Sequence, residues 1–189
     1  MCPTISSVGT IIRRTERKIM NILKLLSCTL ALFFVGLVNA QAVELTHQQE
    51  QQIKSEIIEL VNDYAIYRDT LNAAGYAGTF IESGRIRLRG EWIEGRETLR
   101  KRIESADPNE VTMHVVGTGH IDVIDFDTAV GIQYMTVYIK KLKRPRAEDQ
   151  VVPIDGFAAL GKYDDKYVRT DEGWKFVERK MTVVFTSEE

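Results

Sequence analysis

Two long β-rich runs joined by a tight polar turn end the chain, and they constrain its fold more than any other feature. The first run spans residues 156–168, the turn spans residues 169–173, and the second run spans residues 174–185. Both runs are rich in aromatic and aliphatic residues, and the turn ends in Gly173. A glycine-containing turn between two such runs is typical of a β-hairpin. We therefore predict that the chain finishes in two long paired strands.

More strands are predicted before this hairpin. Polar and apolar residues alternate along residues 111–124 and 128–139, as in strands with one buried face. Residues 86–93 are predicted to form a small hairpin that turns near Gly90. Residues 140–155 are predicted to form a solvated loop that begins with a basic run.

A helical pattern precedes the strands. Thr46 and Gln49 fit a capping box, and apolar residues follow at helical spacing. We predict a long helix that ends near Gly75, a short helix over residues 76–81 and a charged helix over residues 95–104. Helices followed by a meander of strands indicate the α+β class. The expected architecture is a cone-shaped α+β barrel, with N-terminal helices packed on a strongly curved antiparallel sheet that encloses a pocket.

The N-terminus has the order of residues found in a secretory signal peptide. A basic start leads into an apolar run of 14 residues at positions 25–38, and the small residues Ala40 and Ala42 follow. The apolar run is short for a membrane span, although an uncleaved anchor remains an alternative. We predict a segment 1–40, with Met20 as a possible true start, and a single domain over residues 41–189. The mature protein would be exported, periplasmic or secreted, and would meet the membrane only through the signal segment before cleavage.

Charge and cysteine content argue against several classes of function for the predicted mature domain. Residues 41–189 hold 20 Lys and Arg against 26 Asp and Glu, a net charge of −6, which argues against nucleic-acid binding. Both cysteines, Cys2 and Cys28, precede residue 41, so the domain has no thiol for a disulfide, a nucleophile or a metal. No histidine spacing typical of zinc sites and no phosphate-binding loop is present. We expect no metal and no cofactor.

Three segments carry a resemblance to a known family. They are the run from Asp63 to Asp69 near the end of the first helix, the Gly95-Arg96-Glu97 start of the charged helix, and residues 113–117 together with the final hairpin. In this order and spacing they resemble the SnoaL-like domain of the nuclear-transport-factor-2-like superfamily, which has the scytalone-dehydratase-like and polyketide-cyclase-like fold. The resemblance implies a cone fold with an apolar cavity and a homodimer formed through the open sheet face.

The resemblance also implies a catalytic pair. Enzymes similar to scytalone dehydratase and the lindane dehydrochlorinase use an Asp and a His inside the cone, and the matching positions here are Asp69 and His114. A carboxylate that accepts a hydrogen bond from one imidazole nitrogen makes the other nitrogen a better base. The second histidine of scytalone-dehydratase-like sites has no counterpart here, and Arg68 stands where that enzyme type has a tyrosine.

Several aromatic residues are candidates for lining a hydrophobic pocket, although core packing explains them as well. The candidate substrate-binding residues are Tyr64, Tyr67, Trp92, Tyr134, Tyr138, Phe157 and Tyr163. His120 shares the strand parity of His114, and a rim or surface position is expected for it. Asp164 and Asp165 are interpreted as turn and surface charges.

Three functions therefore remain open for the predicted domain. The first is a cofactor-independent lyase or isomerase, dehydratase-like or cyclase-like, that acts on a small hydrophobic oxygenated substrate through the Asp69–His114 pair. The second is a non-catalytic protein that holds a small hydrophobic ligand. The third is a dimerising interaction module, since the sheet face can associate with a second copy.

Overall fold

The computed structural model describes residues 44–187 of the chain, which belong to a single compact unit. The predicted signal segment, its cleavage site and the alternative start at Met20 lie outside the described residues. Among the residues that are described, no helix is both long enough and apolar enough to cross a membrane.

A long helix, α2 (His47–Asp69), opens the unit and begins at the predicted capping box. The Gln49 N–H donates to the Thr46 hydroxyl oxygen at 3.3 Å, and the Thr46 N–H donates to the Gln49 side chain at 2.9 Å. The helix ends before the predicted Gly75 because Leu71 takes a left-handed conformation with φ of 54°. Asn72 then caps the short helix α3 (Ala73–Gly78), which starts earlier than predicted.

Six strands follow, with one more helix between the second and the third. These elements are β1 (Phe80–Leu88), β2 (Glu91–Glu94), α4 (Arg96–Glu104), β3 (Glu110–Val123), β4 (Thr128–Lys141), β5 (Ala159–Thr170) and β6 (Gly173–Phe185). The final hairpin, the preceding strand pair and the charged helix are therefore confirmed. The first strand is longer than predicted.

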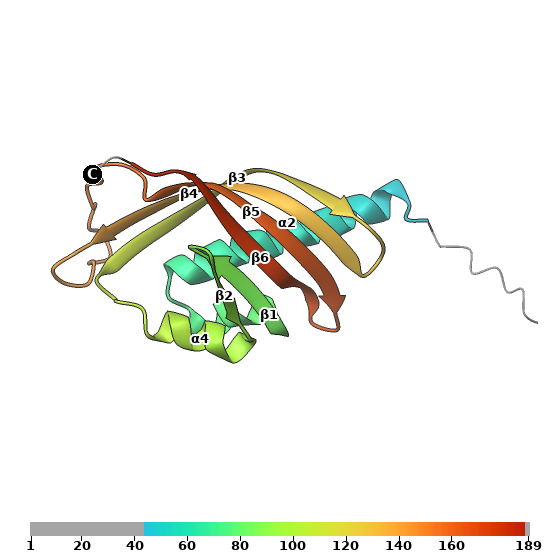
Figure 1. Cartoon of the computed structure of the whole chain (residues 1–189), viewed down its shortest axis with the longest axis horizontal. Coiled ribbons are helices and arrows are strands. Elements are labelled where there is room, and N and C mark those ends of the chain that lie inside the picture. Colours follow the sequence, from blue (N-terminus) through green and yellow to red (C-terminus); the bar gives the residue numbers. More distant parts are fainter. Residues whose placement is uncertain (1–43, 188–189) are drawn as a thin grey trace, which may run out of the picture. The chain divides into compact units, whose positions relative to one another are not determined.

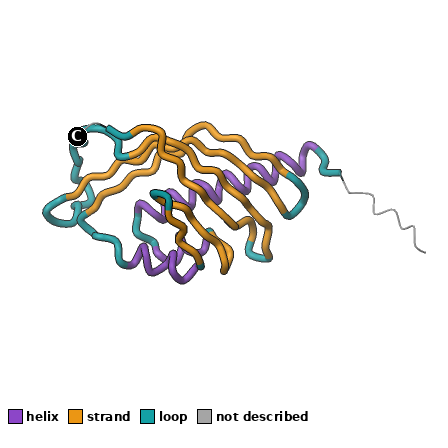
Figure 2. Tube along the Cα trace, viewed as in Figure 1, coloured by secondary structure: helices purple, strands orange, loops and turns teal. Residues whose placement is uncertain are grey.

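The strands form one curved sheet in the order β2-β1-β6-β5-β4-β3, and α2 lies across its concave side (Figure 1). The fold class is the predicted α+β cone, but the sheet stays open, with β2 and β3 at its edges. The prediction of a purely antiparallel sheet is wrong at one place, because β1 pairs with β6 in parallel. The helix α4 follows the β1–β2 hairpin and separates it in the chain from β3, and this hairpin joins the sheet beside the last strand, β6. Figure 2 shows the helices and strands of the unit by colour.

Two β-bulges change which side chains face the concave side. In β3 the pairing with β4 shifts by one residue between Val116 and Gly119, and in β6 the pairing with β5 shifts next to Phe176. An extra residue in one strand inverts the alternation of side chains beyond it. Alternation counted from the residues before each bulge therefore gives the wrong face for the residues after it. The β3 bulge determines the face of His120, and the β6 bulge determines the face of Arg179.

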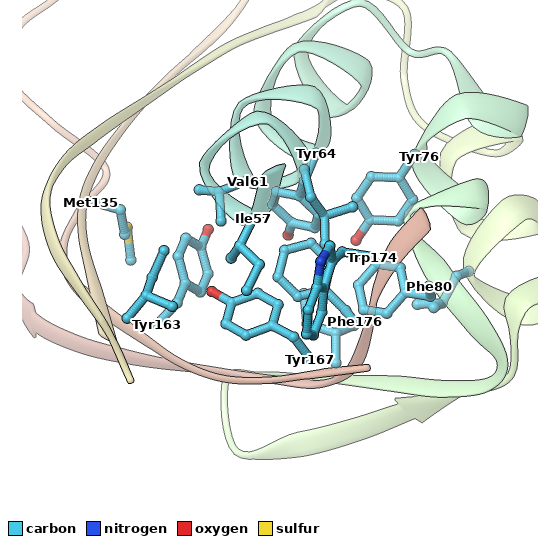
Figure 3. Close-up of a cluster of buried hydrophobic side chains, with 14 of the residues drawn as sticks. Ile57, Val61, Tyr64, Tyr76, Phe80, Met135, Tyr163, Tyr167, Trp174 and Phe176 are labelled. Atoms are coloured by element: carbon cyan, nitrogen blue, oxygen red, sulfur yellow. The ribbon is translucent and has the colours of Figure 1, made fainter. Parts of the chain in front are cut away.

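The core lies between α2 and the concave face and is dominated by aromatic rings (Figure 3). The rings of Tyr64, Tyr76, Phe80 and Phe176 pack with centroids 5.0 to 6.1 Å apart. Tilted and edge-to-face pairs at such distances stabilise a core beyond the burial of their surface. The interior of the cone is thus largely filled by side chains.

Candidate active site

Asp69 and His114 meet at the junction of α2 and the edge strand β3. Asp69 is the last residue of α2, and His114 lies on the inner face of β3. The His114 Nδ1 is 2.6 Å from Asp69 Oδ1, and the His114 backbone N–H donates to Asp69 Oδ2 at 2.7 Å. The Thr112 hydroxyl donates to Oδ1 at 2.9 Å. One short stretch of β3 therefore holds both oxygens of the carboxylate.

The electrostatics of this pair fix the hydrogen-bond direction. Burial raises the pKa of Asp69, but the hydrogen bonds from the His114 ring, the His114 backbone and Thr112 outweigh it, so the pKa of Asp69 lies below its ordinary value. The carboxylate is then ionised near neutral pH and can only accept hydrogen bonds. His114 therefore donates from Nδ1, and in the neutral form of the ring this leaves the lone pair on Nε2. The His114 side chain is only 9% exposed.

A buried arginine that the sequence analysis did not single out lies deeper in the cone. Arg179 of β6 has no exposed surface, and its Nε and Nη2 donate to the two oxygens of Asp165 at 2.9 and 2.8 Å. The rings of Tyr64, Tyr163 and Phe176 surround its guanidinium at 4.1 to 4.2 Å. Its Nη1 has no hydrogen-bond partner among the described residues.

The β6 bulge explains why this arginine was missed. Trp174 and Phe176 are buried, so strict alternation would place Glu178 inside and Arg179 outside. The shift beside Phe176 reverses this order. The interpretation of Asp165 as a surface charge is also wrong, but no bulge is involved: Asp165 alternates with the buried Tyr163 and Tyr167 on the inner face of β5 and pairs with Arg179. A buried Asp–Arg pair with one unused donor is a candidate binding element.

Tyr64 links the Asp–His pair to the buried arginine. Its ring lies 6.5 Å from the His114 ring in an edge-to-face arrangement and 4.2 Å from the Arg179 guanidinium. Tyr64 and Tyr163 are almost fully buried among the core rings of Figure 3. Burial raises the pKa of Tyr163 well above its ordinary value, so this hydroxyl stays protonated.

The seven predicted ligand-binding aromatics do not line one common cavity. Tyr64 and Tyr163 are core residues, and Tyr67 lines a separate hollow next to Trp174. Three of the remaining four lie on the outer face of the sheet, where Trp92 and Tyr134 are exposed and Tyr138 is half-buried. Phe157 is half-buried in the loop before β5. Trp92 instead packs under the Arg85 guanidinium at 4.3 Å.

His120 does not share the face of His114, contrary to the parity argument. The β3 bulge between Val116 and Gly119 turns it outward, where its Nε2 lies 2.9 Å from Asp122. Its side chain is 73% exposed, as expected for a surface histidine. Within residues 44–187, no three His, Cys, Asp or Glu side chains gather in a way that could hold a metal ion.

Three of the hollows on the surface of the described unit are large enough to hold a small molecule. The largest, about 440 Å³, lies between α2 and the β5–β6 turn and is rimmed by acidic side chains. A groove of about 350 Å³ lies between α2 and the bulged part of β3, and a third hollow of about 280 Å³ lies on the outer face of the sheet. None of the three includes Asp69 or His114 in its walls. The groove between α2 and β3 includes Val116, two residues after His114, and the first hollow includes Tyr67, two residues before Asp69.

Comparison with known proteins agrees with this architecture. The SnoaL-like domain family matches residues 49–180, and the chain belongs to this family. No curated protein matches the sequence.

Solved structures share the fold at low sequence identity. A putative scytalone dehydratase from Novosphingobium aromaticivorans is 20% identical, with a TM-score of 0.64 over 76% of this chain and 92% of that chain. A hexachlorocyclohexane dehydrochlorinase, LinA type 2, is 14% identical, with a TM-score of 0.60 over 75% and 92%. A protein of unknown function from Mycobacterium tuberculosis is 23% identical, with a TM-score of 0.61 over 74% and 76%. These likenesses establish the nuclear-transport-factor-2-like cone fold.

Proposed function

We propose that this protein is a cofactor-independent lyase or isomerase in which His114 acts as the general base and Asp69 orients it. The observation that carries this proposal is the 2.6 Å contact between His114 Nδ1 and an Asp69 carboxylate fixed by two further hydrogen bonds. A base held in one tautomer by an ionised partner is suited to taking a proton from carbon. The names of two structural neighbours, a putative scytalone dehydratase and a hexachlorocyclohexane dehydrochlorinase, denote elimination reactions of this class, which supports the proposal by analogy.

The proposed reaction begins with proton transfer from a substrate carbon to His114 Nε2. The electron pair of the broken C–H bond then either expels a leaving group from the adjacent carbon, giving an alkene, or moves toward a neighbouring carbonyl oxygen. In the second case reprotonation at another carbon gives the isomer, and His114 returns the proton. Asp69 keeps its charge throughout and stabilises the imidazolium that forms.

Arg179 supports the part of this proposal that concerns the substrate. Its free Nη1 is a buried donor, and its guanidinium contacts the same Tyr64 ring that packs against His114. Since Arg179 is fully buried and its charge is balanced by Asp165, a substrate oxygen would meet Nη1 and be stabilised by it only when the surrounding rings move apart. We therefore propose a small, largely apolar, oxygenated substrate. Since the protein is predicted to be exported, it would meet this substrate outside the cytoplasm.

A proton-exchange assay tests the proposal without knowledge of the natural substrate. A panel of small cyclic ketones, β-hydroxy ketones and chlorinated rings is incubated with the protein in D₂O, and loss of C–H signals or appearance of alkene is followed by NMR. General-base catalysis contributes about 10²- to 10⁴-fold, so His114→Ala should lose at least a hundredfold in rate. His47→Ala, which removes an exposed histidine at the start of α2, should behave as the wild type. Equal rates in His114→Ala and the wild type would refute the proposal.

A second candidate function is association through the outer sheet face. Met113, Val115, Tyr134 and Phe185 point away from α2 and are 48 to 60% exposed. Together with the filled interior, this apolar face favours a module that pairs with a second copy of itself. Sedimentation of the wild type against Val115→Lys/Tyr134→Lys tests it: a dimer that becomes a monomer supports the homodimer, and a monomeric wild type excludes it.

A further inference from the structure

The groove between α2 and β3 carries an inference about which molecules this protein binds. Its walls combine aliphatic side chains with a single buried amide: Lys54, Ile58, Val61, Asn62, Val116, Gly117, Gly119, His120, Ile121 and Gln133. Its volume of about 350 Å³ falls within the range of small-molecule sites.

The groove lies next to the candidate active site along β3. Val116 and His114 face the same side of β3, ahead of the bulge, and two residues along a strand span about 7 Å. Val61 lies one turn before Tyr64 and Ala65 on the inward face of α2. Since aromatic rings fill the cone beside His114, the proposed approach of a molecule to its ring is from the groove side.

The charges around the groove are already compensated. Lys54 Nζ pairs with Glu50 at 2.6 Å, and His120 Nε2 lies 2.9 Å from Asp122. Two amides also line the groove: Asn62 is exposed on α2, whereas Gln133 on the strand side is only 5% exposed. Charge complementarity therefore favours an uncharged ligand.

The orientation of the Gln133 amide follows from its neighbours. The Tyr167 hydroxyl donates its only proton to Asp165 at 2.9 Å, so toward Gln133 it can only accept. A hydrogen bond between Gln133 and Tyr167 is among the influences that lower the pKa of Tyr167, against the dominant rise from burial. The Gln133 NH₂ group therefore faces Tyr167, and its carbonyl oxygen lies against Gly119. This oxygen is an acceptor at the wall of the groove.

Gly119 makes this arrangement possible. A Cβ at residue 119 would overlap the end of the Gln133 side chain, whereas the backbone there needs no left-handed conformation. The overlap is with the end of a flexible side chain, so alanine at this position would push the amide aside and leave the strand intact. The absence of a side chain at Gly119 therefore determines where the acceptor lies.

We infer that the α2–β3 groove binds a small, uncharged, mostly apolar molecule that carries a hydroxyl group, an alcohol or a phenol, and that the Gln133 carbonyl oxygen accepts the hydroxyl proton. This inference rests on the proposed function only in taking the bound molecule to be the substrate of His114. Binding itself is measurable without turnover.

The test compares two probes of nearly equal shape by NMR titration of the ¹⁵N-labelled protein. The probe 2-naphthol can donate a hydroxyl proton, and 2-methoxynaphthalene cannot. The donor should bind about five- to tenfold more tightly, since one neutral hydrogen bond is worth roughly 1 kcal/mol, and it should shift the amide signals of Gly119 and Ile121. Gly119→Ala should bind both probes equally, whereas Gly78→Ala, a glycine with open space around it outside the groove, should keep the preference.

A second variant protects the test against misfolding. Gln133→Leu removes the acceptor at similar volume and should also abolish the preference. Equal binding of both probes by the wild type, a preference that survives in both Gly119→Ala and Gln133→Leu, or signal shifts confined to residues outside the groove would each overturn the inference. Selective binding together with no proton exchange would refute the proposed catalysis and leave the binding site standing.

Discussion

The buried ion pair of Asp165 and Arg179 gives the sharpest prediction about stability. Both side chains have no exposed surface, and two hydrogen bonds of 2.9 and 2.8 Å join them. The Tyr167 hydroxyl donates a third hydrogen bond to Asp165. Burial opposes the charge of Arg179, but its ion pair with Asp165 outweighs this and raises the pKa of the guanidinium, so the arginine stays charged. Asp165→Asn keeps the shape of the side chain and removes the compensating charge.

The expected cost is large because the guanidinium cannot reach water. Breaking a fully buried pair by removing one partner costs about 3 to 5 kcal/mol, against a total stability of about 5 to 15 kcal/mol for a typical domain. The double variant Asp165→Leu/Arg179→Met should recover most of this loss, since replacing both charges with apolar groups is often neutral. Asp155→Asn is the matched control. The Asp155 carboxylate lies 2.9 Å from Lys140 Nζ, a distance like that in the buried pair, but the Asp155 side chain is 93% exposed. Asp155→Asn should therefore lower the free energy of unfolding by less than about 1 kcal/mol.

Urea unfolding followed by far-UV circular dichroism and by the fluorescence of the buried Trp174 measures all three variants. Two results would refute the reasoning. One is a loss of less than about 1 kcal/mol in Asp165→Asn, which would mean that the guanidinium reaches solvent. The other is a double variant as unstable as the single one, which would mean that packing and not charge sets the cost.

Three further predictions concern the helix start and the Asp–His pair. Thr46→Ala should destabilise the protein by about 1 kcal/mol in urea unfolding, because α2 loses its N-cap. Thr112→Val should raise the pKa of Asp69, measured by ¹³C NMR of the carboxyl carbon, whereas Thr112→Ser should restore it; equal values in all three proteins would contradict a role for this hydroxyl. The pKa of Asp69 is lower in the folded protein than its ordinary value of 3.8, so the ionised carboxylate stabilises the fold. This contribution to the free energy of unfolding should be complete at pH values above 3.8 and should be lost as the pH falls through the pKa of the folded state. Asp69→Asn should lack this part of the acid dependence.

The parts of the fold that follow from local patterns could be predicted from the sequence. The capping box at Thr46 fixed the start of α2, and the turn at Gly173 fixed the final hairpin. The parallel pairing of β1 with β6 was not predicted, because it joins strands that are far apart in the chain and leaves no local signal. The end of α2 was misplaced because it depends on a left-handed Leu71, a conformation that leucine rarely adopts.

The residues of the candidate site were likewise predicted only in part. The Asp69 and His114 positions came from the family resemblance, and the structure brings these side chains into contact. Arg179 and the outward turn of His120 could not be read from alternation, because a single extra residue in β6 and in β3 inverts the pattern. The structure places the seven candidate ligand-binding aromatics in different parts of the fold, and the sequence alone could not separate them, because the same residue types fill a core and line a pocket.

The ¹⁵N NMR spectrum of the His114 ring tests the central claim most directly. If an ionised Asp69 orients His114 as a base, the neutral ring carries its proton on Nδ1, and Nε2 gives the signal of an unprotonated nitrogen. Asp69→Asn should weaken or abolish this preference, and the exposed His47 should show none in either protein. A wild-type ring with its proton on Nε2 would contradict the account, because the nitrogen assigned to proton abstraction would already be occupied.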